Sequence, residues 1–167
     1  FTAQVSGNLT SFSGYQVTLD GRARDVTVNG RPAGEIALVG RTENQQLNLS
    51  LTTTLLGQPQ VIAARVNLAS EGLESSVSTT FTNADLTNLF QLALPGSGVR
   101  ITGRANGTIQ AKGNLYDEEE GIFSLAGLTG SAEFSELTFR VEDVQLNATT
   151  PLVVNFRPNE VTFERTR

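Results

Sequence analysis

The chain of 167 residues contains no histidine, cysteine, methionine or tryptophan, and its 17 acidic and 12 basic residues leave a formal charge of −5. Without histidine and cysteine it lacks the usual ligands of zinc, haem, copper and iron–sulfur centres, and it can form neither a Ser–His–Asp triad nor a thiolate nucleophile. The acidic balance disfavours a nucleic-acid-binding protein, because such proteins present basic surfaces. We therefore expect a protein that is not an enzyme, has no cofactor or metal, and has no nucleic-acid partner.

Apolar residues alternate with polar ones along most of the first 82 residues. Between residues 46 and 55, four leucines at odd positions alternate with Asn, Ser and Thr. Such a period of two places apolar side chains on one face of a strand and polar side chains on the other. The same pattern recurs at residues 15–19, 26–28, 36–38 and 62–68.

Turn signals divide these alternating runs. Asp20-Gly21 and Asn29-Gly30 are typical of two-residue hairpin loops, because both central positions of such loops need positive φ. Residues 57–59, 71–72 and 157–159 add further Gly and Pro signals. We predict an all-β chain of ten to twelve antiparallel strands in meander order.

One segment departs from this period. After Thr82, apolar residues recur at spacings of three and four, which predicts a short amphipathic helix at residues 83–92. A carboxylate at Asp85, three residues after the Thr82 hydroxyl, fits a helix-capping arrangement. The following Pro95-Gly96 ends the helix and makes residues 93–98 the best candidate for an internal joint in an otherwise single unit spanning 1–167.

The longest alternating run covers residues 99–115. Its odd positions are Val, Ile, Gly, Ala or Leu, and its even positions are all polar. A hairpin that turns at Asn106-Gly107 would interrupt this phase, whereas one long, bent strand would keep it. We favour the single strand over the hairpin.

The acidic run at residues 117–120 and the paired carboxylates elsewhere do not point to a site. Four consecutive acids lack the alternating spacing of a calcium loop, so we expect a solvated loop. Glu133 with Glu136, or Glu160 with Glu164, could be nominated as a hydrolytic pair, but nothing singles them out.

The apolar face of such a sheet must be covered, and two interpretations fit the pattern. A second sheet could pack on it to form a sandwich core, or acyl chains could lie on it in an open trough. Periodicity alone is compatible with both. The trough interpretation predicts that the groove is lined by Leu47, Leu49, Leu51, Ile62, Ala64, Val66, Leu68, Val77, Phe81, Val99, Ile101, Ile109, Leu115, Leu137, Phe139, Val141, Leu152, Val154, Phe156, Val161 and Phe163.

Residues 83–167 resemble the C-terminal region of the TamB family, part of the AsmA-like superfamily of bacterial envelope proteins. The resemblance lies in glycine- and aliphatic-rich strands and in the joints between them. The carrying segments are residues 84–89 (ADLTNL), 103–109 (GRANGTI) with 112–117 (KGNLYD), 130–134 (GSAEF) with 137–139 (LTF), 150–154 (TPLVV) and 159–163 (NEVTF).

This resemblance implies a β-taco, an elongated antiparallel sheet curled into an open half-pipe with an apolar interior. It also implies one segment of a larger protein anchored in the inner membrane of a diderm bacterium and located in the periplasm. Its activity would be to carry phospholipid acyl chains between the inner and outer membranes, or to assist outer-membrane biogenesis. The implied partners are neighbouring segments of the same chain and an outer-membrane barrel that docks through other regions.

The alternative is an extracellular β-sandwich that acts as a binding or adhesin module. Carbohydrate-binding sandwiches usually present exposed aromatic platforms. This chain has no tryptophan and only two tyrosines, which counts against that alternative.

Overall fold

The computed structural model describes residues 1–7, 11–28, 31–87, 101–117, 120–124, 127–148, 150–158 and 160–165. These residues form thirteen strands and one short 3-10 helix, so the all-β prediction is confirmed, with more strands than the ten to twelve expected. The elements are β1 (Thr2–Ser6), η1 (Phe12–Gly14), β2 (Gln16–Val28), β3 (Arg31–Glu43), β4 (Gln46–Thr53), β5 (Gln60–Asn67), β6 (Glu74–Asp85), β7 (Ile101–Asn114), β8 (Tyr116–Asp117), β9 (Ile122–Phe123), β10 (Thr129–Val141), β11 (Val144–Ala148), β12 (Leu152–Arg157) and β13 (Glu160–Arg165).

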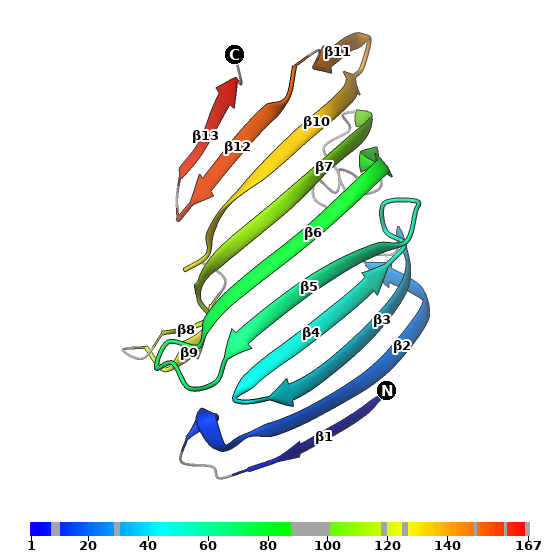
Figure 1. Cartoon of the computed structure of the whole chain (residues 1–167). Coiled ribbons are helices and arrows are strands. Elements are labelled where there is room, and N and C mark those ends of the chain that lie inside the picture. Colours follow the sequence, from blue (N-terminus) through cyan, green and yellow to red (C-terminus); the bar gives the residue numbers. More distant parts are fainter. Residues whose placement is uncertain are drawn as a thin grey trace.

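Eleven strands form one antiparallel sheet in the order β1-β2-β3-β4-β5-β6-β7-β10-β12-β13, with β11 paired to β10 beside this path. Strands β8 and β9 form a separate two-stranded hairpin. The described strands lie side by side in a single twisted layer, without a second large sheet facing the first (Figure 1). β1 and β13 are the two outer strands of the path, so the sheet is open rather than closed into a barrel. This arrangement differs from a sandwich, which needs two facing sheets.

β7 runs from Ile101 to Asn114 as a single strand, which confirms the long-strand prediction over the hairpin at Asn106-Gly107. Both neighbours of β7 carry irregularities opposite this dipeptide, between Phe81 and Ala84 in β6 and between Phe134 and Glu136 in β10. A side chain at Gly107 would collide with the carbonyl oxygen of Glu133. The glycine therefore permits close strand approach rather than a turn.

The side chain of Asn106 connects the three strands at this point. Its Oδ1 accepts a hydrogen bond from the backbone N–H of Asn83 in β6, and its Nδ2 donates to Oε2 of Glu136 in β10 over 2.6 Å. Arg104 also donates to Oδ1 of Asn83 over 2.8 Å. Asn106-Gly107 thus lies where the regular strand β7 is hydrogen-bonded through the Asn106 side chain to the irregular parts of β6 and β10.

Two local predictions are wrong. Asp20-Gly21 does not form a turn but lies inside β2, where Gly21 is buried because the ring of Phe1 covers it. Residues 83–85 of the predicted helix belong to β6, and helical backbone is described only at Leu86 and Thr87. Residues 88–92 and the joint at 93–98 lie outside the described residues.

The helix begins later than predicted because Asp85, and not Thr82, is the capping residue. Oδ1 of Asp85 accepts a hydrogen bond from the backbone N–H of Thr87 over 2.9 Å, so Asp85 caps the turn that Thr82 was expected to cap. The strand continues through Asn83, whose φ of 50° lies at the irregularity of β6.

Buried residues form two small clusters at opposite ends of the strands rather than one central core. Phe81, Ala84, Leu86 and Ala105 form one cluster. Val66, Leu68 and Leu73 form the other. No large side chain of the described residues is less than 2% exposed. Between these two clusters, the described residues form no large packed core on either face of the sheet.

Candidate functional site

Cross-strand register gathers apolar side chains into two adjacent rows on one face of the sheet. We call this surface the apolar face. Because antiparallel neighbours present directly paired residues on the same side, each row can be followed from strand to strand. The first row contains Gly21, Leu38, Leu51, Ile62, Thr79, Ile109, Ala132, Val154 and Phe163. The second row contains Ala3, Leu19, Gly40, Leu49, Ala64, Val77, Ala111, Gly130, Phe156 and Val161.

These rows run across the strands, from the β1 edge to the β13 edge. Nine interstrand steps at about 4.8 Å make the second row about 43 Å long, which exceeds the roughly 30 Å hydrocarbon thickness of a bilayer. β7 contributes only Ile109 and Ala111 to the two rows. The long strand therefore crosses the apolar strip instead of lining it lengthwise.

The rows contain a single hydroxyl group, that of Thr79, and no charged side chain. Their aliphatic members between β3 and β12 are half-buried, except Ala132, which is 8% exposed and buried. Phe163 and Val161 at the outer strand are 71% and 58% exposed. The described strands form no second sheet over this face. A continuous apolar surface of this kind is unusual in a protein that has no ligand or partner for it.

Large side chains lie flat over the small residues of this face. Leu19 and Leu49 lean over Gly40, and the ring of Phe156 lies over Gly130, where an added side chain would collide with it. Phe1 covers Gly21 in the same way. Large side chains thus fill the space above the glycines that pair with them on neighbouring strands.

At one end of the strands the apolar face is bordered by four aromatic rings, which we call the aromatic rim. Phe12 contacts Tyr15, Tyr116 and Phe123 with ring centroids 5.8, 5.4 and 6.2 Å apart, and Tyr116 contacts Phe123 at 5.3 Å. Phe12, Tyr15 and Tyr116 pack against the buried cluster around Val66, whereas Phe123 is 67% exposed.

The aromatic rim joins parts of the sheet that are distant in strand order. Phe12 lies in η1, before β2, whereas Tyr116 follows β7, five strand positions away. In a flat sheet five steps would separate them by about 24 Å, but their ring centroids are 5.4 Å apart. The connections therefore converge over this end of the apolar face, where they meet Leu47 and Val66.

The opposite end is bordered by the cluster around Phe81, whose ring centroid is 5.9 Å from that of Phe134. Leu56, from the connection between β4 and β5, packs on the same cluster. Together the two clusters limit the uncovered apolar strip to the middle of the strands.

The predicted groove residues that lie within paired strands all fall on the apolar face by register, and Leu68 and Leu115 leave the strands to join the cluster at the aromatic rim. Val66, Leu68 and Phe81 are 7%, 6% and 4% exposed, so they serve as packed core rather than as open surface. Ile101 pairs with Val141, but its side chain is not described, and Val99 lies outside the described residues.

The groove prediction left out the small members of the rows and those in β1, β2 and β3. Leu19 and Leu38 lie in the alternating runs at residues 15–19 and 36–38, which the sequence shows but which the groove prediction does not include. Ala111, Gly130 and Ala132 carry no hydrophobic signal of their own, and only the pairing register assigns them to the surface.

The opposite face is largely polar, although Val39 and Val61 are exposed on it at 55% and 52%. The hydroxyl and backbone N–H of Thr87, with the charge of Arg104, hold the pKa of the Asp85 carboxyl below its ordinary value against the opposing effect of partial burial. Within the described ranges no three His, Cys, Asp or Glu residues gather as a metal site. In the acidic run, Oδ1 of Asp117 accepts from the N–H of Glu120 over 3.2 Å and thereby closes a local turn.

The fold and the site define an open, single-layer antiparallel sheet with one apolar and one polar face. No family model, curated protein or solved structure matches the chain. In the part of the chain that the structure describes, no helix has the length and apolarity needed to cross a bilayer.

Proposed function

We propose that the apolar face shields acyl chains of phospholipids and that the chain is a segment of a lipid-conduit protein. The observation that carries this proposal is the pair of apolar rows that cross the whole sheet and that no described element covers. Acyl chains are flexible and apolar, and they need neither hydrogen-bond partners nor a shaped pocket.

The energetics favour such a ligand. Transfer of apolar surface out of water contributes about 25 cal/mol for each Å². A chain that covers half-buried residues such as Ile62, Val77 and Ile109 gains only the part that the sheet leaves exposed. The gain accumulates along a strip about 43 Å long, so the length of the contact compensates for its shallow depth.

The surface has features that suit passage of lipid rather than retention of one molecule. The single hydroxyl of Thr79 offers no anchor for a particular headgroup. Leu19 and Leu49 fill the space over Gly40, and Phe156 lies over Gly130, so these side chains leave neither glycine open to an acyl chain on the apolar face. Both features favour acyl chains in general over one lipid species.

The resemblance to the TamB family extends the proposal to location and shape. In that case the sheet is one part of a half-pipe in the periplasm, with the apolar face inside, and phospholipid moves between the inner and outer membranes. The convergence of Phe12 and Tyr116 over the apolar face supports inward curvature at one rim. Neighbouring segments of the same protein and an outer-membrane barrel are the proposed partners.

Adjacent alanines in β5 provide a matched test. Ala64 lies in the second apolar row, while Ala63 is exposed on the polar face of the same strand. We replace each in turn with the photoreactive residue benzoylphenylalanine, irradiate the protein in cells, and identify bound lipid by mass spectrometry. We expect lipid adducts at position 64 and few at position 63.

A blocking substitution gives a second measurement. Ile109→Asp places a charge in the first row, two strands from Ala64, and should reduce the adducts at position 64 because acyl chains avoid a carboxylate. Circular dichroism verifies that this variant keeps its strand content. Equal labelling at positions 63 and 64, or unchanged labelling at 64 in folded Ile109→Asp, would contradict acyl-chain binding on this face.

A further inference from the structure

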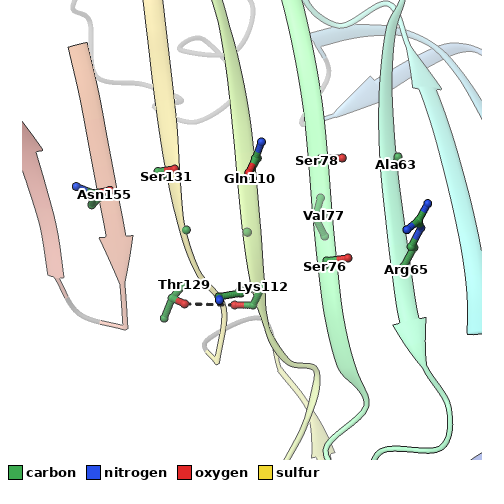
Figure 2. A pocket seen from close by; sticks show the side chains of 12 residues that line it. Ala63, Arg65, Ser76, Val77, Ser78, Gln110, Lys112, Thr129, Ser131 and Asn155 are labelled. Atoms are coloured by element: carbon green, nitrogen blue, oxygen red, sulfur yellow. Dashed lines mark hydrogen bonds between the residues drawn. The ribbon is translucent and has the colours of Figure 1, made fainter. Parts of the chain in front are cut away.

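The polar face carries a hollow that lies opposite the proposed lipid surface. Its volume is about 600 Å³, and β5, β6, β7, β10 and β12 contribute to it. The lining residues are Ala63, Arg65, Ser76, Val77, Ser78, Gln110, Ala111, Lys112, Thr129, Gly130, Ser131 and Asn155. Figure 2 shows Ser76 and Ser78 beside the ribbon of β6, with Gln110 and Arg65 projecting from the strands on either side.

The charge of this hollow is opposite to that of the protein. Arg65 and Lys112 line it, and none of its lining residues is acidic, although the whole chain has a formal charge of −5. Lys112 is also the only lysine of the sequence. Two cations without a carboxylate among the lining groups favour an anionic ligand.

The pairing register places the two cations on either side of a hydroxyl. Arg65 pairs with Ser76, and Ser76 pairs with Lys112, so the three residues lie in one row across β5, β6 and β7. The outer two backbones are about 10 Å apart, or two interstrand steps. Both long side chains can therefore reach one phosphate group held above Ser76.

The next row of the hollow is neutral and rich in hydrogen-bonding groups. Ser78, Gln110, Ser131 and Asn155 follow one another across β6, β7, β10 and β12. Hydroxyl and amide side chains both donate and accept hydrogen bonds, as the hydroxyls of a sugar require. The hollow is also larger than a lone phosphate needs and falls within the usual 300–1,000 Å³ range of ligand sites.

We propose that this hollow binds a sugar phosphate, with the phosphate between Arg65 and Lys112 and the sugar hydroxyls along the row from Ser78 to Asn155. The same chemistry occurs in free sugar phosphates and in phosphorylated inositol headgroups of lipids. The proposal does not require acyl-chain shielding, because its ligand contacts are the charged and polar side chains of the other face, although Val77, Ala111 and Gly130 of the second apolar row also border the hollow.

Calorimetric titration of the whole chain tests the site with three probes: glucose 1-phosphate, inorganic phosphate and glucose. We expect glucose 1-phosphate to bind more tightly than either single component and to weaken as salt rises. Arg65→Gln and Lys112→Gln should each weaken binding about tenfold, because each removes a charge-assisted contact. Both residues are exposed, so the substitutions leave the packed clusters intact.

Arg140→Gln is the matched control, because Arg140 is an exposed arginine that pairs with Thr102 on the polar face and does not line the hollow. It should change binding less than twofold. Flotation with phosphatidylcholine vesicles, with and without phosphatidylinositol 4-phosphate, distinguishes the source of the ligand. Vesicle binding that needs the phosphoinositide and is lost in Arg65→Gln would assign a lipid headgroup to the site.

Three outcomes would overturn the proposal. They are failure of all probes to bind, binding of glucose or inorganic phosphate as tight as that of the sugar phosphate, and equal loss of binding in Arg140→Gln and Arg65→Gln. Vesicle binding that persists without phosphoinositide and in Arg65→Gln would belong to the apolar face instead. Because Ala63 borders the hollow, positions 63 and 64 are also compared in Arg65→Gln, in which a headgroup in the hollow is held less tightly. The two proposals can then fail separately.

Discussion

Truncation of Phe81 tests whether the small cluster at one end of the apolar face stabilises the sheet. The side chain is 4% exposed and packs on Ala84, Leu86 and Ala105, with the ring of Phe134 at 5.9 Å. Phe→Ala substitutions in cores cost about 3–5 kcal/mol, of which an aromatic pair accounts for about 0.5–1.5 kcal/mol. Because the cluster borders an uncovered face and can relax, we expect the lower end, about 3 kcal/mol.

The matched control is Phe163→Ala, which makes the same chemical change in β13 where the ring is 71% exposed. It should cost less than about 0.5 kcal/mol. In urea unfolding followed by circular dichroism, a slope of about 2 kcal/mol per molar converts the Phe81 loss into a midpoint decrease of about 1.5 M. Equal midpoints for the two variants would refute the assignment of Phe81 to a stabilising core.

Two further predictions concern the polar face. Asn106→Ala removes the hydrogen-bond partner of both the Asn83 N–H and the Glu136 carboxylate, so it should lower the free energy of unfolding in urea by about 1 kcal/mol. Gln110→Ala on the same strand is the control and should cost little. Similar losses in the two variants would show that the hydrogen bonds from Asn106 to β6 and β10 do not stabilise the sheet. Asp85→Asn should destabilise the protein by less than about 1 kcal/mol near neutral pH. Since the folded-state pKa of Asp85 is lowered, the stability difference between Asp85→Asn and wild type should be present above about pH 4 and disappear as pH falls through the folded pKa. A stability difference that does not change with pH would contradict this reasoning.

The strands and their faces could be predicted from the sequence because alternation is a local property. Leu47, Leu49 and Leu51 needed no knowledge of their neighbours to be placed on one side of β4. The turns were harder to predict, because their signals depend on context. β3 and β4 are joined through Asn44 and Gln45, which adopt φ of 50° and 62° without a glycine, whereas Asp20-Gly21 carries the turn signal and remains extended.

The two rows could not be predicted, because register depends on where each strand begins and where it is irregular. A shift of one residue between two strands would move every side chain beyond it to the other face. The irregularities of β6 and β10 opposite Gly107 restore the match on both sides of β7, so that Ala84, Ala105 and Leu137 still share a face. Asn83 suits the φ of 50° at the irregularity of β6, but an isolated asparagine does not predict such an irregularity from the sequence alone. The hollow could not be predicted for the same reason, since Arg65 and Lys112 are 47 positions apart in the sequence and only the register places them on either side of Ser76.

The distribution of packing explains how a sheet can keep an apolar face open. An ordinary domain buries its apolar side chains in the middle, and that burial supplies much of its stability. Here the clusters around Phe81 and Val66 lie at the two strand ends, and the hydrogen-bonded ladders hold the strands between them. The central rows are therefore not needed as core and are available to a ligand. A bulky residue at Gly40 would displace the side chains of Leu19 and Leu49. At Gly130 it would also collide with the backbone carbonyl of Gln110 and so disturb the pairing of β10 with β7. The same separation leaves the polar side of the central strands uncovered by the described elements, and this is where the proposed sugar-phosphate site with Arg65 and Lys112 lies.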